Sequence, residues 1–563
     1  TQTSVKWINQ LVDDSGGYLP HIIQDAIGNP VIDQTLHWAA PNQDCRNGNT
    51  GPDGDTDCRG ASGEPYVGPV PMVVKLQGAL ASSASTGFPE SWWLPNADDI
   101  DCTNVSGFPV TNDTGDDFDC SGTFFGSADG ADTIAAMGEG YSIMFYGNDQ
   151  PTSMLWYRDN SVGITRQNVY ASGVGLWLIR DENDSETGLL NGKLPGPAAQ
   201  AGQDPNGDPA DRAVIREIPL VIQPRSFNED GSLFYPADRA FFEGLGDGQI
   251  FADNTGVNIP FLPQSTSDIA PLWNPEAFFN VMVVNGRTWP VLEVAPERYR
   301  FRILNASDSG FLNLSLSQVD GKQKASREGF RWIHEIPIYQ VGADQSLLPQ
   351  VVRIEKGYAT PLPGNGDDVH PNYPECLLPN GGLRKNCVPI VPATFADQAL
   401  LIGPGERADT VVDFSGRENG DIIIVFNTAP DAPFGGFPDV PADPGTTGQV
   451  MMFIVNDALA NSSGDPSTPA PELVLDSNPG GVARLGDPVY IQDLALLEEE
   501  SALVCVTVDA VTGVINLDPN SLPPDCGPVL GSVVFAPKAA VLGVDGSGGG
   551  SVQLADDPVA QNP

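Results

Sequence analysis

The apolar segments of this sequence are short, rich in β-branched and aromatic residues, and bounded by glycine, proline and aspartate. Such segments predict strands of a few residues that are joined by turns. No long run repeats apolar residues at helical spacing. The sequence therefore predicts an all-β chain of tandem β-sandwich domains. The segments expected to form strands are Ser4–Leu11, Pro71–Leu76, Tyr141–Tyr146, Gly173–Ile179, Glu217–Ile222, Phe279–Val284, Tyr299–Ile303, Leu312–Leu316, Ala399–Ile402, Thr410–Phe414, Ile422–Phe426 and Val450–Ile454.

Shifts in composition divide the chain into parts. Residues 1–190 form a first domain, and residues 191–211 are rich in glycine, proline and aspartate, which is typical of a linker. Residues 212–456 form a second domain, and residues 457–563 begin a third that is expected to be incomplete. Two long acidic loops, Asn42–Pro71 and Pro95–Asp132, are inserted in the first domain.

The charge of the chain excludes several classes of function. The sequence has 73 acidic and 28 basic residues, a net charge of −45. This charge repels nucleic-acid phosphates and anionic lipid, so we expect no nucleic-acid partner. No apolar run reaches the length of a membrane span, so we expect none.

The eight cysteines fall into four pairs that are close in sequence, and each pair flanks a polar loop. We expect disulfides between nearest neighbours, with free thiols or a metal site as the alternatives. Disulfides predict an exported protein that is secreted, on the cell surface or in the periplasm. The first residue is Thr1, which fits a processed secreted protein or a piece of a longer one. The pairs are Cys45 with Cys58, Cys102 with Cys120, Cys376 with Cys387, and Cys505 with Cys526.

The two acidic loops contain alternating aspartates, which offer the hard oxygen ligands that calcium prefers. Neither loop has the complete spacing of a calcium-binding loop, and a solvated charged loop is the alternative interpretation. The candidate calcium ligands are Asp53, Asp55 and Asp57 in the first loop and Asp113, Asp116, Asp117 and Asp119 in the second.

Several segments together resemble the multicopper oxidases, in particular the branch of bilirubin oxidase and spore-coat laccase. Their order and spacing extend over most of the chain. This resemblance implies cupredoxin-like Greek-key β-sandwiches and, in the family, copper-dependent oxidation of small phenols, bilirubin or metal ions. The segments that carry it include Val5–Leu11, Thr86–Trp92, Leu155–Asn160, Asn228–Pro236, Val284–Pro290, Tyr299–Ser307 and Gly405–Asp409.

The resemblance also predicts that the copper ligands of the first domain are replaced. The family's first His-x-His motif aligns with Lys75 and Gln77, and the second aligns with Arg158 and Asn160. Lysine and arginine carry no lone pair for copper near neutral pH. The four histidines, at positions 21, 37, 334 and 370, match none of these positions. We therefore predict no copper cofactor in this chain, and a polar cluster of Lys75, Arg158 and Asp159 in place of the metal.

Both ends of the aligned region fall short of the family's domains. The family's first strands precede the segment that Val5 begins, and its third-domain motifs follow the last residues of this chain. We therefore expect protein partners, either a strand-donating chain or identical copies.

The sequence leaves the function open between an exported structural or interaction subunit and an oxidase. The structural or interaction subunit follows from the replaced copper ligands. In that role the chain is expected not to be an enzyme. In the second, the chain is part of a larger copper-dependent oxidoreductase of the laccase type whose copper motifs lie elsewhere. A small-molecule-binding or calcium-binding module is a third interpretation.

Overall fold

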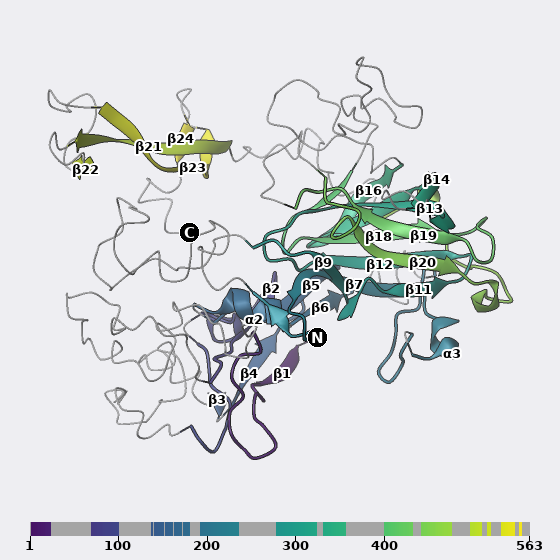
Figure 1. Cartoon of the computed structure of the whole chain (residues 1–563), viewed down its shortest axis with the longest axis horizontal. Coiled ribbons are helices and arrows are strands. Elements are labelled where there is room, and N and C mark those ends of the chain that lie inside the picture. The colour runs from purple at the N-terminus through teal and green to yellow at the C-terminus, as the bar shows by residue number, and fades with distance from the viewer. Residues whose placement is uncertain are drawn as a thin grey trace. The chain divides into compact units, whose positions relative to one another are not determined.

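The computed structural model describes the chain in two compact units, Thr1–Gly248 with Pro263–Ser477, and Gln249–Leu262 with Asn478–Pro563 (Figure 1). The described residues are 2–23, 69–89, 91–100, 137–138, 140–150, 152–161, 163–171, 173–180, 192–205, 207–235, 277–323, 330–355, 399–431, 441–475, 496–508, 515–518, 531–545 and 551–553.

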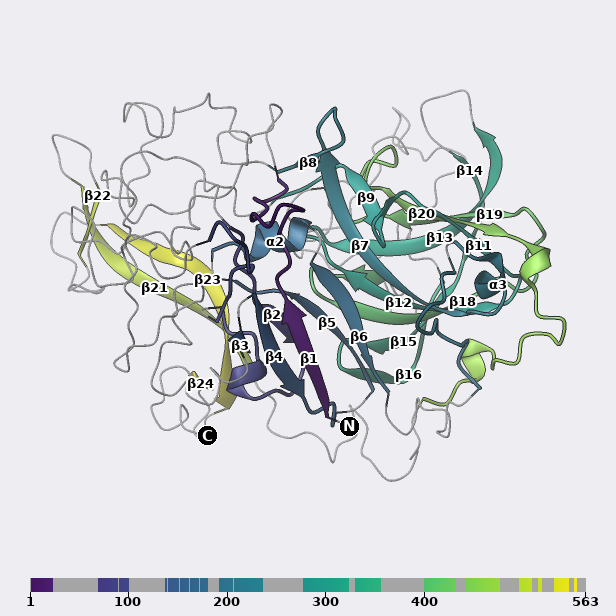
Figure 2. The same ribbon diagram turned by 90° about the horizontal axis from the view of Figure 1, so that it is seen from below.

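The first sandwich belongs to the first unit and consists of two three-stranded sheets, ordered β1-β4-β3 and β2-β5-β6. Met144 and Tyr146 of the first sheet share one apolar cluster with Leu76 and Leu155 of the second, so the two sheets enclose a common core. Figure 2 shows β1 and β4 beside β2, β5 and β6. The elements are β1 Thr3–Ile8, β2 Val74–Gln77, η3 Ser83–Ser85, β3 Met137–Gly138, β4 Tyr141–Tyr146, β5 Ser153–Asp159, α2 Thr165–Ala171 and β6 Val174–Ile179.

The second sandwich, in the same unit, has an eight-stranded and a six-stranded sheet. The first runs β10-β9-β7-β12-β18-β15-β16, with β8 paired to β7; the second runs β11-β20-β19-β13-β14, with β17 paired to β13. The elements are α3 Pro209–Arg212, β7 Glu217–Phe227, β8 Leu233–Phe234, β9 Val281–Val284, β10 Arg287–Thr288, β11 Val291–Val294, β12 Arg298–Asn305, β13 Leu312–Gln323, β14 Phe330–Ile336, β15 Ile338–Ala343, β16 Ser346–Ile354, β17 Leu400–Ile402, β18 Arg407–Asp413, β19 Ile422–Asn427, β20 Gln449–Val455, η7 Asp457–Leu459 and η8 Ala470–Glu472.

Aromatic side chains fill the space between these two sheets. Alternate residues of β12, beginning at Tyr299, point into the core, as the period of a strand requires. The ring of Phe301 stacks on Phe453 with 5.1 Å between centroids, and Phe414 meets Phe453 edge-on at 5.3 Å. Such pairs add directional contact to the apolar burial of each ring.

The prediction of an all-β sandwich fold is confirmed. Each of the twelve segments expected to form a strand overlaps one. The expected bounds differ most at Leu312–Leu316, because β13 runs on to Gln323. The expected strands did not include β5, since its polar end, Arg158–Asp159, obscures the alternation. They also did not include β11, β14, β15 and β16 of the second sandwich.

The opposite face of the eight-stranded sheet buries charges. Arg300 and Arg302 on β12 are each 1% exposed, and they bind Asp409 of β18 and Glu217 of β7. Arg180 of the first sandwich also binds Glu217. The ion pairs thus connect three adjacent strands of one sheet with the end of β6.

The two sandwiches of the first unit are joined by hydrogen bonds to the main chain of β5. Met154 N donates to Asp344 O at 2.9 Å, and Arg407 Nε donates to Met154 O at 2.7 Å. A Cβ atom at Gly405 would lie 3.3 Å from the Trp156 ring, so β5 packs closely on the second sandwich. These contacts fix the strand that carries the candidate site.

The second unit contains a four-stranded antiparallel sheet with the order β22-β21-β23-β24. Its strands are β21 Leu496–Val508, β22 Ile515–Asp518, β23 Gly531–Asp545 and β24 Ser551–Gln553. In the part of the chain that the structure describes, no helix has the length and apolar character needed to cross a membrane.

Candidate functional site

The four positions that align with copper ligands lie on strand β2 and at the end of strand β5, with Asn160 directly after β5. These strands pair antiparallel, with Lys75 opposite Arg158 and Gln77 opposite Trp156. Lys75 and Gln77 share a face because side chains alternate along a strand. Arg158 lies on that same face as the direct cross-strand partner of Lys75. Two cations at the positions that the motifs mark thus lie side by side in the structure.

Arg158 is held by its own strand. Its Nη1 donates to Asp159 O at 2.8 Å and to Asn160 Oδ1 at 3.1 Å. Its guanidinium carbon lies 5.5 Å from the centroid of the Trp156 ring. Burial lowers the pKa of Arg158, and the nearby Asp159 charge partly offsets this effect.

Asp159 does not form the expected carboxylate bridge to Arg158. Its carboxylate accepts hydrogen bonds from Val73 N at 3.0 Å, Ser161 N at 3.0 Å and Ser161 Oγ at 2.8 Å. As the residue after Arg158, Asp159 points to the opposite, core face of the strand. Burial raises the pKa of Asp159 to about 6, although hydrogen bonds from Val73 and Ser161 lower it. The prediction that Lys75, Arg158 and Asp159 form one polar cluster was therefore wrong for Asp159.

A loop closes over β2 beside Lys75. Gly87 has a φ of +67°, and a Cβ atom there would lie 2.4 Å from Val74 O and 2.7 Å from Lys75 Cα. Only glycine fits so close to the strand. The Asn160 side chain fixes the loop by donating from Nδ2 to Gly87 O at 2.8 Å. One former ligand position thus has a structural role.

The donor set at this face does not fit copper. Lys75 and Arg158 offer no acceptor atom, and amide oxygens such as those of Gln77 and Asn160 suit hard cations better than copper. Among the described residues, no three or more histidine, cysteine, aspartate or glutamate side chains form a group that could hold a metal ion. This face presents two like charges directly across two strands, an arrangement that costs stability without a counter-charge.

Comparison with curated proteins gives relatives of one family. The chain is 26% identical over 391 residues to a laccase of Bacillus subtilis, covering 69% of this chain and 48% of the laccase. It is 28% identical over 319 residues to the multicopper oxidase LPR1 homolog 1 of Oryza sativa, covering 56% of this chain and 36% of the relative. These relatives support the multicopper oxidase family for this chain. It spans about half the length, or less, of these curated relatives.

Other comparisons are weaker. No family model matches the sequence. Among solved structures, the multicopper oxidase McoA of Aquifex aeolicus aligns with a TM-score of 0.37 at 16% identity, covering 73% of this chain and 55% of McoA. The laccase-like multi-copper oxidase CueO of Ochrobactrum sp. aligns with a TM-score of 0.38 at 14% identity, covering 84% of this chain and 78% of CueO.

His21 does not lie at a former copper-ligand position, and its contacts are those of a buried residue that stabilises the fold. His21 is 5% exposed, and its Nε2 lies 3.1 Å from Asn168 Oδ1 while its Nδ1 accepts from Ile23 N at 3.2 Å. Both contacts suit a neutral ring with its proton on Nε2. Asn168 in turn donates to Pro71 O at 3.0 Å. His21 thus connects the N-terminal segment to α2 and to the residues before β2.

Stability is expected to fall below pH 6.5 because of His21. Burial lowers the pKa of His21 from 6.5 to about 4, and the hydrogen bond to Asn168 only partly opposes this. The unfolded chain therefore binds the proton more tightly, so the contribution of His21, about 3 kcal/mol, is lost as the pH falls from 6.5 through 4. Urea unfolding at several pH values should show that, as the pH falls from 6.5 to 4, stability changes less favourably in the wild type than in a His21→Gln variant. An equal slope in both proteins would contradict the assignment.

The remaining predicted residues lie outside the described part of the chain. This holds for the seven aspartates proposed for calcium and for seven of the cysteines. Cys505 belongs to β21, where only the backbone is described. The disulfide and calcium predictions therefore stay predictions.

Sequence reasoning missed two features of the second sandwich. One is the buried ion-pair cluster, which the alternation of Arg300 and Arg302 within an otherwise apolar strand could have indicated. The other is a cavity of about 250 Å³ lined by Trp289 and Gln449. This cavity is formed by the turn at Trp289 together with the distant loop at Pro444, and no sequence motif indicates it.

Proposed function

We propose that this chain is a copper-free member of its family and acts as an exported structural or interaction subunit. The observation that carries this proposal is the pair of cations, Lys75 and Arg158, directly opposite each other at former ligand positions. Copper ions at this face would add positive charge beside two fixed cations, and Coulomb repulsion in a half-buried site would oppose their binding. The positions of Gln77 and Asn160 supply no imidazole in compensation.

The proposal also covers the location, the bound ions and the partners of the protein. Sequence-local cysteine pairs favour disulfides and hence an extracellular, cell-surface or periplasmic location. The acidic loops are proposed to bind calcium. Other protein chains, as strand donors or identical copies, are the proposed partners, since β1 and β2 each pair with one strand only among the described residues.

A metal-loading experiment tests the proposal. Purified protein that is incubated with Cu²⁺ and dialysed is expected to retain clearly less than one copper per chain, as measured by elemental analysis. The variant with Lys75→His, Gln77→His, Arg158→His and Asn160→His should gain bound copper, because four imidazoles then converge on one face. Three coppers per wild-type chain would overturn the proposal.

A control separates site binding from adventitious binding by imidazole. Val214 and Val474 are 52% and 53% exposed, so Val214→His with Val474→His adds surface imidazoles that lie on different segments. We expect this control to bind no more copper than the wild type. Equal copper in the control and the four-histidine variant would remove the evidence for a converging site.

A second candidate function is participation in a larger copper-dependent oxidase of the laccase type. It is favoured by the length of the relatives, of which this chain spans about half. In that case the mononuclear copper is held by residues beyond this sequence. Visible absorption by a copper–thiolate bond in the full-length gene product would favour this candidate, and oxidation of a phenol by that product would establish it.

A further inference from the structure

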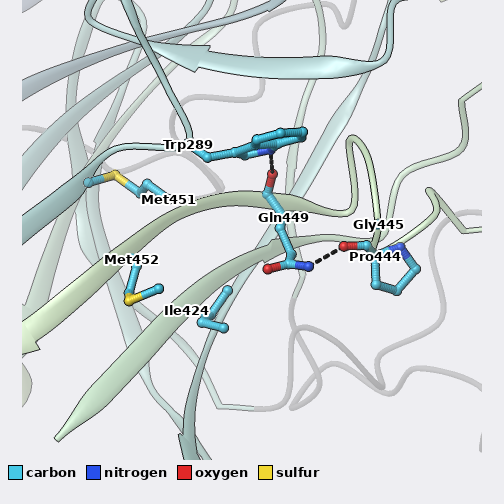
Figure 3. Close-up of a pocket in the computed structure, with 7 residues that line it drawn as sticks. All are labelled: Trp289, Ile424, Pro444, Gly445, Gln449, Met451 and Met452. Atoms are coloured by element: carbon cyan, nitrogen blue, oxygen red, sulfur yellow. Dashed lines mark hydrogen bonds between the residues drawn. The ribbon is translucent and has the colours of Figure 1, made fainter. Parts of the chain in front are cut away.

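A cavity of about 250 Å³ lies beside Trp289 on the second sandwich, away from the former ligand positions (Figure 3). We infer that it binds a small uncharged aromatic molecule of about two rings that carries one hydrogen-bond donor. An apolar cavity of about 150 Å³ holds one benzene ring, so the present volume suits a bicyclic compound. This inference is independent of the proposed function, since none of its residues belongs to β2 or β5.

Trp289 forms one wall in a conformation that costs energy. Its φ is +39°, in the left-handed region that bulky residues avoid, and the residue remains 41% exposed. The indole Nε1 donates to Gln449 O at 3.0 Å, which fixes the ring over the start of β20. A strained backbone that presents an exposed aromatic ring is typical of ligand sites.

Two thioethers form another wall. Met451 and Met452 both line the cavity, although consecutive strand residues ordinarily point to opposite faces. The pairing of β19 with β20 shifts register just before Met451, because Val425 pairs with Met451 and Phe426 with Gln449, which leaves Val450 as the extra residue of a β-bulge. Polarisable sulfur makes favourable contacts with aromatic rings, so this wall favours an aromatic over an aliphatic guest.

Gln449 supplies the polar specificity. Its Nε2 donates to Pro444 O, which fixes the plane of the amide. In Figure 3 the amide oxygen points away from Pro444. No described residue donates to this Oε1, so it is available to accept from an N–H or O–H group of a ligand. The seven lining residues carry no charge, which disfavours ionic ligands in this otherwise very acidic chain.

Titration of the full chain with indole, followed by calorimetry, tests the inference. Indole should bind, and 1-methylindole, which lacks the donor, should bind about five-fold more weakly. Gln449→Met should abolish this difference by removing the acceptor. Trp289→Gly should weaken both ligands at least ten-fold without lowering the unfolding temperature, because glycine adopts a positive φ freely.

The control is Val474→Ala, which alters an exposed residue outside the cavity. It should bind indole as the wild type does. Absence of indole binding by the wild type at millimolar concentration would overturn the inference. So would equal affinity of the wild type for indole and 1-methylindole, or unchanged binding by a folded Trp289→Gly protein.

Discussion

Replacing Asp409 with alanine is expected to lower the free energy of unfolding by about 3–5 kcal/mol. The Asp409 carboxylate accepts from Arg300 Nε at 2.9 Å and from Arg300 Nη2 at 2.6 Å, and it lies 3.0 Å from Arg302 Nη1. Both arginines are 1% exposed, so neither can recover water when the carboxylate is lost. Glu217 would then face three guanidinium groups alone, because Arg180 also binds it.

Urea unfolding of the wild type and the Asp409→Ala variant measures this effect. Arg353→Ala provides the matched control, since Arg353 pairs with Glu355 at 3.1 Å but the two side chains are 53% and 58% exposed. Its loss should cost less than about 1 kcal/mol. Similar losses in the two variants would show that the buried cluster contributes no more than a surface pair.

Those strands of the second sandwich that the sequence predicted could be recognised because local pattern and burial agree in them. Tyr299, Phe301 and Ile303 alternate and reach the core, so the segment gives a correct strand. The same pattern could not reveal that Arg300 and Arg302 are buried. Charged residues are usually exposed, and the acids that neutralise them lie far away in the sequence. Only the parallel pairing of β12 with β7 brings Glu217 to them.

The candidate site was predictable to the extent that one strand pair determines it. Two short motifs placed Lys75 and Arg158 together, and the register of β2 with β5 agrees. The direction of Asp159 was missed, although strand alternation alone would have turned it away from Arg158. The contact between Asn160 and Gly87 could not be foreseen, since it depends on how a loop folds back over β2.

The Asp159 carboxylate is expected to be the main support of this strand end. Asp159→Ala should cost about 3 kcal/mol in unfolding free energy, because it leaves Val73 N–H and both donors of Ser161 without their acceptor. Val73 and Ser161 are each 0% exposed, so water cannot replace the lost bonds. Asp13→Ala is the matched control, since Asp13 also accepts from Ser15 N, Ser15 Oγ and Gly17 N but on the exposed surface. Its effect should be a small fraction of the Asp159 loss.

The pH dependence of the unfolding free energy distinguishes a buried Asp159 carboxyl that binds a proton from one that stays ionised. Burial raises its pKa from 3.8 to about 6, so the folded protein binds this proton more tightly than the unfolded chain does. The resulting stabilisation is present below pH 3.8 and is lost as the pH rises through about 6, opposite in sign to the contribution of His21. Asp159→Asn should therefore show a steeper rise of stability between pH 4 and 6 than the wild type, because the opposing contribution of Asp159 is removed while that of His21 remains. If unfolding curves of Asp159→Asn and wild type run parallel over this range, burial does not control the proton of Asp159, and its hydrogen bonds hold a permanently ionised carboxylate.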